Sequence, residues 1–577
     1  MLINNRKHVY MSAWDLIFSL IMAFMFTVSP HYIADGSFTF SGSIISHTLI
    51  YCVVFLVGFV ALRYLLAKLD FEIGFFRKIL DHKYSLLILG LLMFLIWLPV
   101  LIILYPGTVI NDTWGQLSQF VYAFYSGDKI QFDYLGDHHP VLTTIIMGQL
   151  IVPLANALGN LQIAFFVYII LQSMVTCLGF AYSLTYMNQK LKVGSGFIFI
   201  AFLIYSLLPI FPGSAQMIGK DSLNAWIFVF FTISFMEIVR TRGESLDSAY
   251  NRDLFILLAW AFCVTKKVSF YVVLLSMLLL LFVVKKNRIK IGVILLCGVI
   301  LMQVAWPRIM SATGIVPGGK TEMLSLPYQM TARYVKEHPD DISEDEYVVI
   351  DRMLRMDSLA DRYDPVSADP VKGFAFYERF ETSAYVDYIK VWAAQGLRHP
   401  VTYLNAILAM ESGWFSWTKY YPLMDMNWHS QLNKSFFSED STVRPERVGK
   451  IAKAYQGLLD KLYETPVVGF IFTYGLYSAL IPAFVITTLL TRRKKNEIHA
   501  WIVSMPIFFS LALGCWLAPV SIHFEGRRYL YPIIFTALIL TAWCRYWLKL
   551  EDTNDANEAV PEEMNLNGSN SSTHSVL

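Results

Sequence analysis

One stretch of the sequence, residues 105–140, gathers carboxylates and imidazoles that could act on the same substrate. Asp112 lies near its beginning, and Asp137, His138 and His139 lie together at its end. A carboxylate and an imidazole over one cavity can activate a hydroxyl nucleophile or hold a divalent ion. The sequence has no Cys and His spacing of the zinc type, so the identity of any metal is unknown. We expect catalytic roles for Asp112, Asp137 and His139, and a substrate-binding role for His138.

Each of these residues also has a purely structural interpretation. Asn111 or Asp112 could be the N-cap of an interfacial helix, because Asn and Asp are equally good caps. His138 and His139 precede Pro140 and could cap and orient the helix that follows. The sequence alone leaves both alternatives open.

A second group of candidates consists of cations at the ends of apolar runs, on the predicted outer side where positive charge is rare. The group comprises Lys220 with Asp221, the pair Lys266 and Lys267, and the pair Arg527 and Arg528. Cations in such places suit a lipid-linked phosphate, to which Arg gives two parallel hydrogen bonds and Lys a point charge. The alternative is snorkelling, in which long side chains merely reach the lipid headgroups.

The elements that must position these residues are membrane helices. The 577-residue chain is 56% hydrophobic and only 16% charged, whereas a soluble protein carries about 25% charged residues. This composition excludes a soluble enzyme, and a net charge of +2 gives no basic surplus for binding nucleic acid. Apolar runs near the length of a membrane span predict about twelve transmembrane helices. They lie near 13–34, 43–66, 86–105, 161–187, 194–212, 223–239, 253–266, 268–284, 291–307, 467–490, 500–519 and 529–548.

The distribution of Lys and Arg sets the predicted orientation. Outside residues 308–466, basic residues gather mostly in segments on one side, which the positive-inside rule makes cytoplasmic. Both termini are therefore expected in the cytoplasm of a multi-pass plasma-membrane protein. The apolar stretch 141–157 contains Pro153. If it crossed the membrane, every later basic cluster would lie on the opposite side from the one that the positive-inside rule favours. We interpret it as a re-entrant or interfacial helix in the first large outer loop.

The predicted fold class is an all-α polytopic membrane protein with a mostly helical outer domain. Residues 1–307 form the N-terminal membrane domain with a catalytic outer loop at 105–160, and residues 308–466 form the extracytoplasmic domain. Ser343 and Glu346 make a capping box there, which indicates a helix start. Residues 467–548 form the C-terminal membrane helices, and the polar residues 549–577 are expected to be a disordered cytoplasmic tail.

Several of these features together resemble the GT-C superfamily of membrane glycosyltransferases. They are a span that feeds a large outer loop with an early acid, a Gly-Asp dipeptide, the element His139-Pro140-Val141-Leu142, and a late Arg528-Tyr529 followed by Pro532. The resemblance is to the branch that contains the protein O-mannosyltransferases, the lipid A aminoarabinose transferases and uncharacterised bacterial relatives. It covers about 86–290 and 500–545.

The resemblance implies transfer of a sugar from a polyprenyl-phosphate carrier to a cell-envelope glycan, lipid or protein at the outer membrane face. By the same resemblance, Asp112 is the first-loop acid and general base, and Arg528 and Tyr529 lie near the carrier phosphate. Lys220 with Asp221, and Lys266, match positions that bacterial relatives use. No cofactor is implied with certainty, and a divalent metal is an open possibility.

Two other classes of function stay open at the level of sequence. A transporter or flippase of a lipid-linked substrate needs polar or broken helices at mid-membrane depth, where only scattered residues such as Gln172 and Gln303 occur. A membrane acyltransferase would use His138 or His139 as its base.

Overall fold

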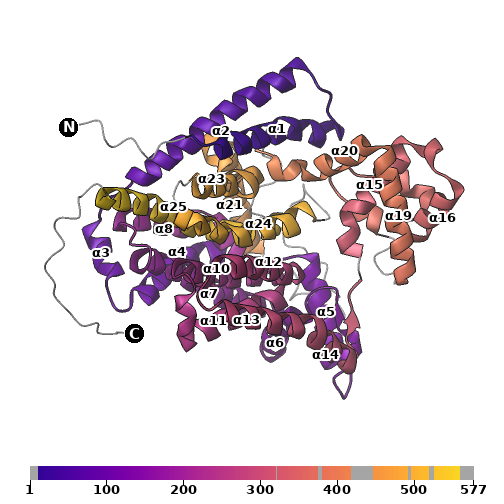
Figure 1. The fold of residues 1–577 in the computed structure, drawn as a ribbon. Helices are drawn as coiled ribbons and strands as arrows, with labels where there is room; N and C mark the ends of the chain where they lie inside the picture. The colour runs from indigo at the N-terminus through magenta and orange to yellow at the C-terminus, as the bar shows by residue number, and fades with distance from the viewer. Residues whose placement is uncertain are drawn as a thin grey trace.

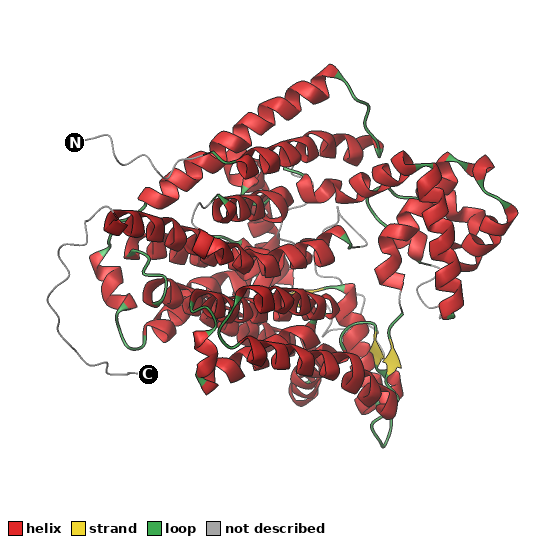
Figure 2. Cartoon of the chain, viewed as in Figure 1, coloured by secondary structure: helices red, strands yellow, loops and turns green. Residues whose placement is uncertain are grey.

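The computed structural model describes residues 11–319, 321–373, 380–417, 446–491, 495–518 and 526–558. Helices dominate this part of the chain, and the strands are short pieces (Figure 2). The first half contains α1 (Ala13–Asp35), α2 (Gly42–Lys68), α3 (Gly74–Leu80), α4 (Ser85–Ile103), α5 (Asn111–Tyr125), α6 (Val141–Leu158), α7 (Leu161–Gln189), α8 (Ser195–Leu207), α9 (Ile210–Ala215), α10 (Lys220–Arg240), α11 (Ala249–Thr265), α12 (Lys267–Val283), α13 (Arg288–Ile300) and α14 (Trp306–Thr313).

The second half begins with a group of short helices and ends in further apolar ones. The group contains α15 (Ser325–Glu337), α16 (Glu344–Leu354), α17 (Leu359–Arg362), α18 (Asp369–Lys372), α19 (Thr382–Arg398), α20 (Pro400–Glu411) and α21 (Glu446–Glu464). The apolar part contains α22 (Pro466–Phe470), α23 (Ile481–Leu490), α24 (Met505–Leu511) and α25 (Tyr531–Glu558). Three π-helical turns extend neighbouring helices: η3 (Leu301–Ala305), η9 (Leu476–Leu480) and η11 (Ala512–Trp516). Pieces of 3₁₀ helix used below are η4 (Thr321–Leu324), η7 (Ser412–Phe415), η10 (Lys495–Ser504) and η12 (Gly526–Leu530).

Nine helices in the described part of the chain are long and apolar enough to cross a membrane. They span Ala13–Asp35, Gly42–Lys68, Ser85–Ile103, Val141–Leu158, Leu161–Gln189, Lys220–Arg240, Arg288–Thr313, His499–Trp516 and Gly526–Lys549. The chain is therefore an all-α membrane protein whose environment is a lipid bilayer. Three further apolar helices are shorter, Ser195–Leu207, Lys267–Val283 and Leu476–Leu490.

The twelve predicted spans correspond to these helices with two differences, so the number twelve is not confirmed. The run 253–266 falls in α11, which is neither among the nine nor among the shorter apolar helices. The stretch that we interpreted as re-entrant, α6, has 18 residues and is long enough to span by length and composition. Its re-entrant placement stays a prediction.

The last helix extends into the segment that we expect to be a polar tail. Helix α25 continues through Glu558 and so includes residues 549–558. A helix that already runs for five turns extends easily into polar residues, because each added residue gains a hydrogen bond without a new nucleation cost. Residues 559–577 lie outside the described residues.

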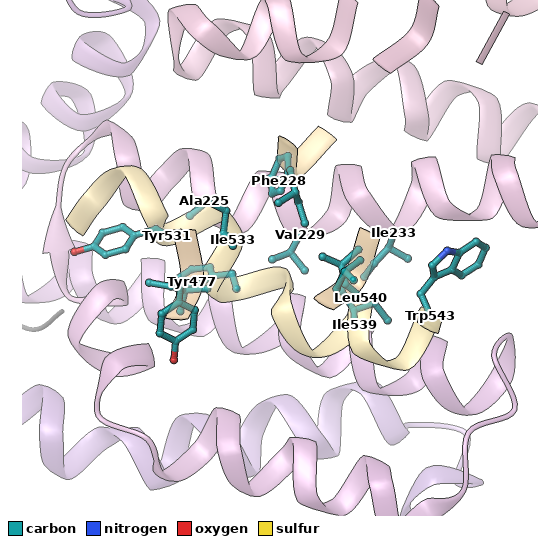
Figure 3. Packing of buried hydrophobic residues seen from close by; sticks show 14 of the residues in the cluster. Ala225, Phe228, Val229, Ile233, Tyr477, Tyr531, Ile533, Ile539, Leu540 and Trp543 are labelled. Carbon is teal, nitrogen blue, oxygen red and sulfur yellow. The ribbon is translucent and has the colours of Figure 1, made fainter. Parts of the chain in front are cut away.

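The apolar helices pack around one large core. Helices α10 and α25 meet at its centre, where Phe228 of α10 lies with Ile533 and Leu540 of α25 (Figure 3). All three side chains are fully buried. The outward faces of α1 and α2 remain apolar and exposed, for example at Ile21 and Val57, as lipid contact requires.

Helices α15 to α20 form a separate lobe beside the bundle (Figure 1). The lobe has its own core, which includes Tyr328, Ile350 and Tyr388. The predicted capping box at Ser343 and Glu346 begins α16 and is confirmed. The lobe is joined to the bundle through α20, which packs against both α15 and α1.

Candidate functional site

Two short parallel strands bring the two acidic candidates together. Strand β1 (Thr108–Val109) pairs with β3 (Met217–Ile218), with Thr108 opposite Met217 and Val109 opposite Ile218. Each strand is followed, after one residue, by a helix, α5 or α10. Asp112 and Asp221 are both the second residue of their helix, so the register of the strands places them at equivalent points. Both carboxylates also lie in the first helical turn, where the helix dipole stabilises negative charge.

Buried polar side chains hold this pair of strands in place. The side chain of Gln216 bonds twice to Thr108, accepting from its N–H at 2.6 Å and donating to its hydroxyl at 2.8 Å. Gln172, which the sequence showed only as a scattered polar residue, donates to the carbonyl oxygens of Ala215 and Met217 at 2.7 and 2.9 Å. Gly107 enters β1 with a φ of +112°, a conformation that favours glycine.

Asp112 is the centre of a group of ion pairs. Nζ of Lys220 lies 2.5 Å from its Oδ2, and Nη1 of Arg528 lies 2.9 Å from the same atom. Nε2 of His139 lies 3.8 Å from its Oδ1. Three residues that are far apart in the chain therefore meet at the Asp112 carboxylate.

Asp221 extends the same group. Nζ of Lys266 lies 2.7 Å from its Oδ1. Lys220 and Arg528 also approach it, at 3.8 and 3.6 Å from Oδ2, so both cations lie between the two carboxylates. We call Asp112, Asp221, Lys220, Lys266 and Arg528 the charged cluster. Three cations against two carboxylates leave it with one positive charge.

The exposure of the cations and the N-cap of α5 decide between two alternatives that the sequence leaves open, snorkelling of the cations and helix capping by Asn111 or Asp112. The side chains of Lys220, Lys266 and Arg528 are only 11%, 12% and 9% exposed, so they turn inward to carboxylates and do not snorkel. The N-cap of α5 is Ile110, so the interpretation of Asn111 or Asp112 as a mere N-cap is wrong. These charges carry a large desolvation cost, and the structure gives them one another as partners.

Tyr529 forms one wall of the cluster. Nζ of Lys266 lies 4.8 Å from the centre of its ring, and the guanidinium carbon of Arg528 lies 5.2 Å from it, both within cation–π range. Arg527 is fully buried one residue earlier, next to Tyr531, with which it interacts electrostatically. Arg527 and Arg528 thus point to different neighbours although they are adjacent in η12.

Asp137, Lys267 and His138 lie beside the cluster and not within it. Nζ of Lys267 lies 3.2 Å from Oδ2 of Asp137, and the Lys267 side chain is 46% exposed. Oδ1 of Asp137 accepts a hydrogen bond from the N–H of Val141, the first residue of α6, at 3.2 Å. The N-cap of α6 is Pro140, so neither histidine is its N-cap. The ring of His138 lies 4.5 Å from that of His139 and connects the two groups.

The electrostatics of this region fix the charge of Asp112 and of the histidines. Burial acts to raise the pKa of Asp112, but the cations Arg528 and Lys220 outweigh it and hold that pKa well below its usual range. Burial and the nearby Lys220 lower the pKa of His139 well below its usual range, and burial lowers that of His138. At neutral pH the site therefore contains an ionised Asp112 beside a neutral His139.

Sequence reasoning missed one charged group at this site, Glu322 in η4. Strand β2 (Gly136–Asp137) pairs with β4 (Val316–Pro317), which brings the beginning of the second half of the chain next to His138. Glu322 then acts electrostatically on His138 and forms an ion pair with the buried Lys372 at 2.6 Å. Two-residue strands have no periodicity, so no signal in the sequence marks this pairing. In the described ranges, no group of three or more His, Cys, Asp or Glu side chains is placed to hold a metal ion.

The model of one protein family matches residues 2–559, and its description is "family of unknown function (DUF6020)". The match covers nearly the whole chain, so the chain belongs to this family. No curated protein and no solved structure matches it.

Proposed function

We propose that this membrane protein is a glycosyltransferase that moves a sugar from a polyprenyl-phosphate carrier to a cell-envelope acceptor at the outer face of the membrane. The observation that carries the proposal is the charged cluster. It combines a carboxylate that can accept a proton with buried cations that can bind a phosphate. The motif resemblance to GT-C glycosyltransferases supports it independently of these distances.

The cations suit the donor phosphate. Lys220, Lys266 and Arg528 pair with the carboxylate oxygens of Asp112 and Asp221, and phosphate oxygens can accept the same charged hydrogen bonds. The surplus positive charge favours a further anion. As the sugar leaves, negative charge grows on the phosphate, and preorganised cations stabilise that charge without reorganisation.

Asp112 suits activation of the acceptor. In the proposed step, the acceptor oxygen bonds to the anomeric carbon and its proton passes to Asp112. The bond from that carbon to the phosphate oxygen breaks, and its electron pair stays on the phosphate. A bound phosphate also offsets the cations that depress the pKa of Asp112, which makes the carboxylate a better base when the donor is present. The step is a single displacement and inverts the anomeric carbon.

The pH profile of a Lys220→Met variant checks this electrostatic account. Loss of the nearest cation raises the pKa of Asp112, because the carboxylate form loses stabilisation. We expect the acid limb of kcat/KM to move to higher pH than in the wild-type protein, whatever the absolute rate. Lys129→Met, an exposed change in the same loop, serves as the control. An acid limb that stays at the wild-type pH, or that moves to lower pH, would contradict an electrostatic effect of Lys220 on Asp112.

The proposal places the charged cluster and the α15–α20 lobe outside the plasma membrane and both termini in the cytoplasm. Single cysteines test this in a variant without the six native cysteines. Val348→Cys in α16 (66% exposed) should react with an impermeant thiol reagent in intact cells. Glu244→Cys, in the segment between α10 and α11, should react only after the membrane is opened. Labelling of position 244 in intact cells would contradict the orientation.

The experiment that tests the function itself compares donors. Purified protein in proteoliposomes is supplied with envelope extract and with either polyprenyl-phosphate sugars or a phospholipid acyl donor. We expect loss of sugar from the polyprenyl phosphate and no loss of acyl groups. Acyl loss alone would identify an acyltransferase, and movement of an intact lipid across the bilayer would identify a flippase.

A further inference from the structure

Glu411, the last residue of α20, is a buried carboxyl group that the proposed reaction does not use. Helix α20 leads from the lobe to the bundle, where it packs against α1 (Figure 1). The Glu411 side chain is only 7% exposed, and no described residue gives its Oε2 a hydrogen-bond partner. Burial raises its pKa well above the usual range, which favours the protonated, uncharged form of the group. A buried carboxyl oxygen without a partner is costly to a folded protein.

The surroundings of Glu411 connect it to the charged cluster. The thiol of Cys515, in the π turn η11, lies within electrostatic range of both Glu411 and Lys266. The same turn packs against η12, which carries Arg528. The 3₁₀ helix η7 follows Glu411 directly in the chain. The hydroxyl of Ser478, in the π turn η9, donates a hydrogen bond to the carbonyl oxygen of Trp414 in η7 and so joins η7 to η9. Single π-helical turns such as η9 and η11 are frequently found at functional sites.

We propose that Glu411 hydrogen-bonds a hydroxyl group of the donor's sugar while the charged cluster holds the phosphate. This rests on the proposed function. The phosphate itself already has Lys220, Lys266 and Arg528. The buried Glu411 carboxyl, which acts on the same Cys515 thiol as Lys266, is therefore left for an uncharged polar group. A protonated carboxyl offers one donor and one acceptor, which matches a hydroxyl. The lobe thereby contributes to choice of the sugar through the end of α20.

Binding of two lipids tests the assignment. The probes are a short-chain polyprenyl phosphate without sugar and the same lipid carrying glucose, galactose or mannose, bound to purified full-length protein in nanodiscs. We expect at least one sugar to add affinity over the bare phosphate in the wild-type protein. Glu411→Met should lose about 3- to 30-fold of affinity for that lipid and none for the bare phosphate. Glu411→Gln, which still donates and accepts, should recover most of the loss.

Thermal stability separates a binding role from a structural one. Glu411→Met removes a buried carboxyl whose Oε2 has no partner among the described residues, so its melting temperature should equal or exceed that of the wild-type protein. Gln395→Met in α19 is the matched control: Gln395 is fully buried, neither of its side-chain polar atoms has a partner among the described residues, and its loss should leave both affinities unchanged.

Several results would overturn the assignment of Glu411. They are equal affinity of the wild-type protein for all four lipids, unchanged sugar-lipid affinity in Glu411→Met, failure of Glu411→Gln to recover it, and an equal loss for the bare phosphate. Failure of the wild-type protein to bind the bare phosphate would instead count against the proposed function.

Discussion

Replacement of Asp112 by Asn is expected to lower turnover by about 10²-fold to 10⁴-fold. Asn keeps the size of the side chain and most of its hydrogen bonding but cannot accept a proton from the acceptor. Donor binding should be unchanged or tighter, because Lys220 and Arg528 lose a competing carboxylate. Steady-state kinetics in proteoliposomes separates these effects, since a loss in kcat without a rise in KM is the signature of a group that acts in the transition state.

A matched control for Asp112→Asn is Asp128→Asn, which makes the same change at an exposed position of the same loop. Its turnover should equal that of the wild-type protein. An Asp112→Asn protein with full activity would remove the general base from the mechanism. Asp221, the other carboxylate of the charged cluster, and Asp137 would then be the next residues to test.

Replacement of Arg528 by Lys is expected to weaken donor binding although the charge is kept. The Arg528 guanidinium reaches Asp112 and Asp221 at once, and a lysine ammonium cannot reproduce that planar fork. A hydrogen bond to a charged group is worth about 1.5 to 3 kcal/mol, which corresponds to a loss of roughly 10-fold to 150-fold in donor affinity. Arg528→Ala should lose at least as much.

The control for Arg528→Lys is Arg252→Lys, at the exposed ion pair with Asp253, where an exchange of cations should change nothing measurable. Donor affinities are compared by titration of purified protein. Wild-type affinity in both Arg528→Lys and Arg528→Ala would show that Arg528 does not bind the donor.

The cations of the charged cluster could be chosen from the sequence because each lies at the end of an apolar run. Lys266 interrupts what would otherwise be one long apolar stretch, and Arg528 lies just before the last span. A charge in such a place is costly unless it has a partner or a function. The structure brings these residues together with Asp112 and Asp221.

The exact partners were not accessible to sequence reasoning. Lys266 and Lys267 are adjacent, yet one pairs with Asp221 and the other with Asp137, because they lie where α11 ends and α12 begins. Glu322 and Glu411 come from a part of the chain that is rich in acids. Nothing in the sequence shows which of those acids is buried, because burial there depends on contacts between residues far apart in the chain.

For the fold as well, some helices could be predicted from the sequence and others could not. Long apolar runs such as 43–66 and 161–187 predicted helices that the structure contains, because their length and composition leave few alternatives. Shorter or interrupted runs are compatible with more than one structure. The run 253–266 contains few charges but is too short by itself, whereas α6 reaches a full 18 residues despite Pro153. Packing against neighbouring helices decides such cases.

The most direct test of the central claim measures whether the charged cluster binds a lipid phosphate. Purified wild-type protein in nanodiscs is titrated with a short-chain polyprenyl phosphate and with the uncharged polyprenol of the same length. We predict that the phosphate binds at least about tenfold more tightly, and that a Lys266→Ala, Arg528→Ala double variant loses this preference. Equal binding of the two lipids by the wild-type protein, or an undiminished preference in the double variant, would contradict the account.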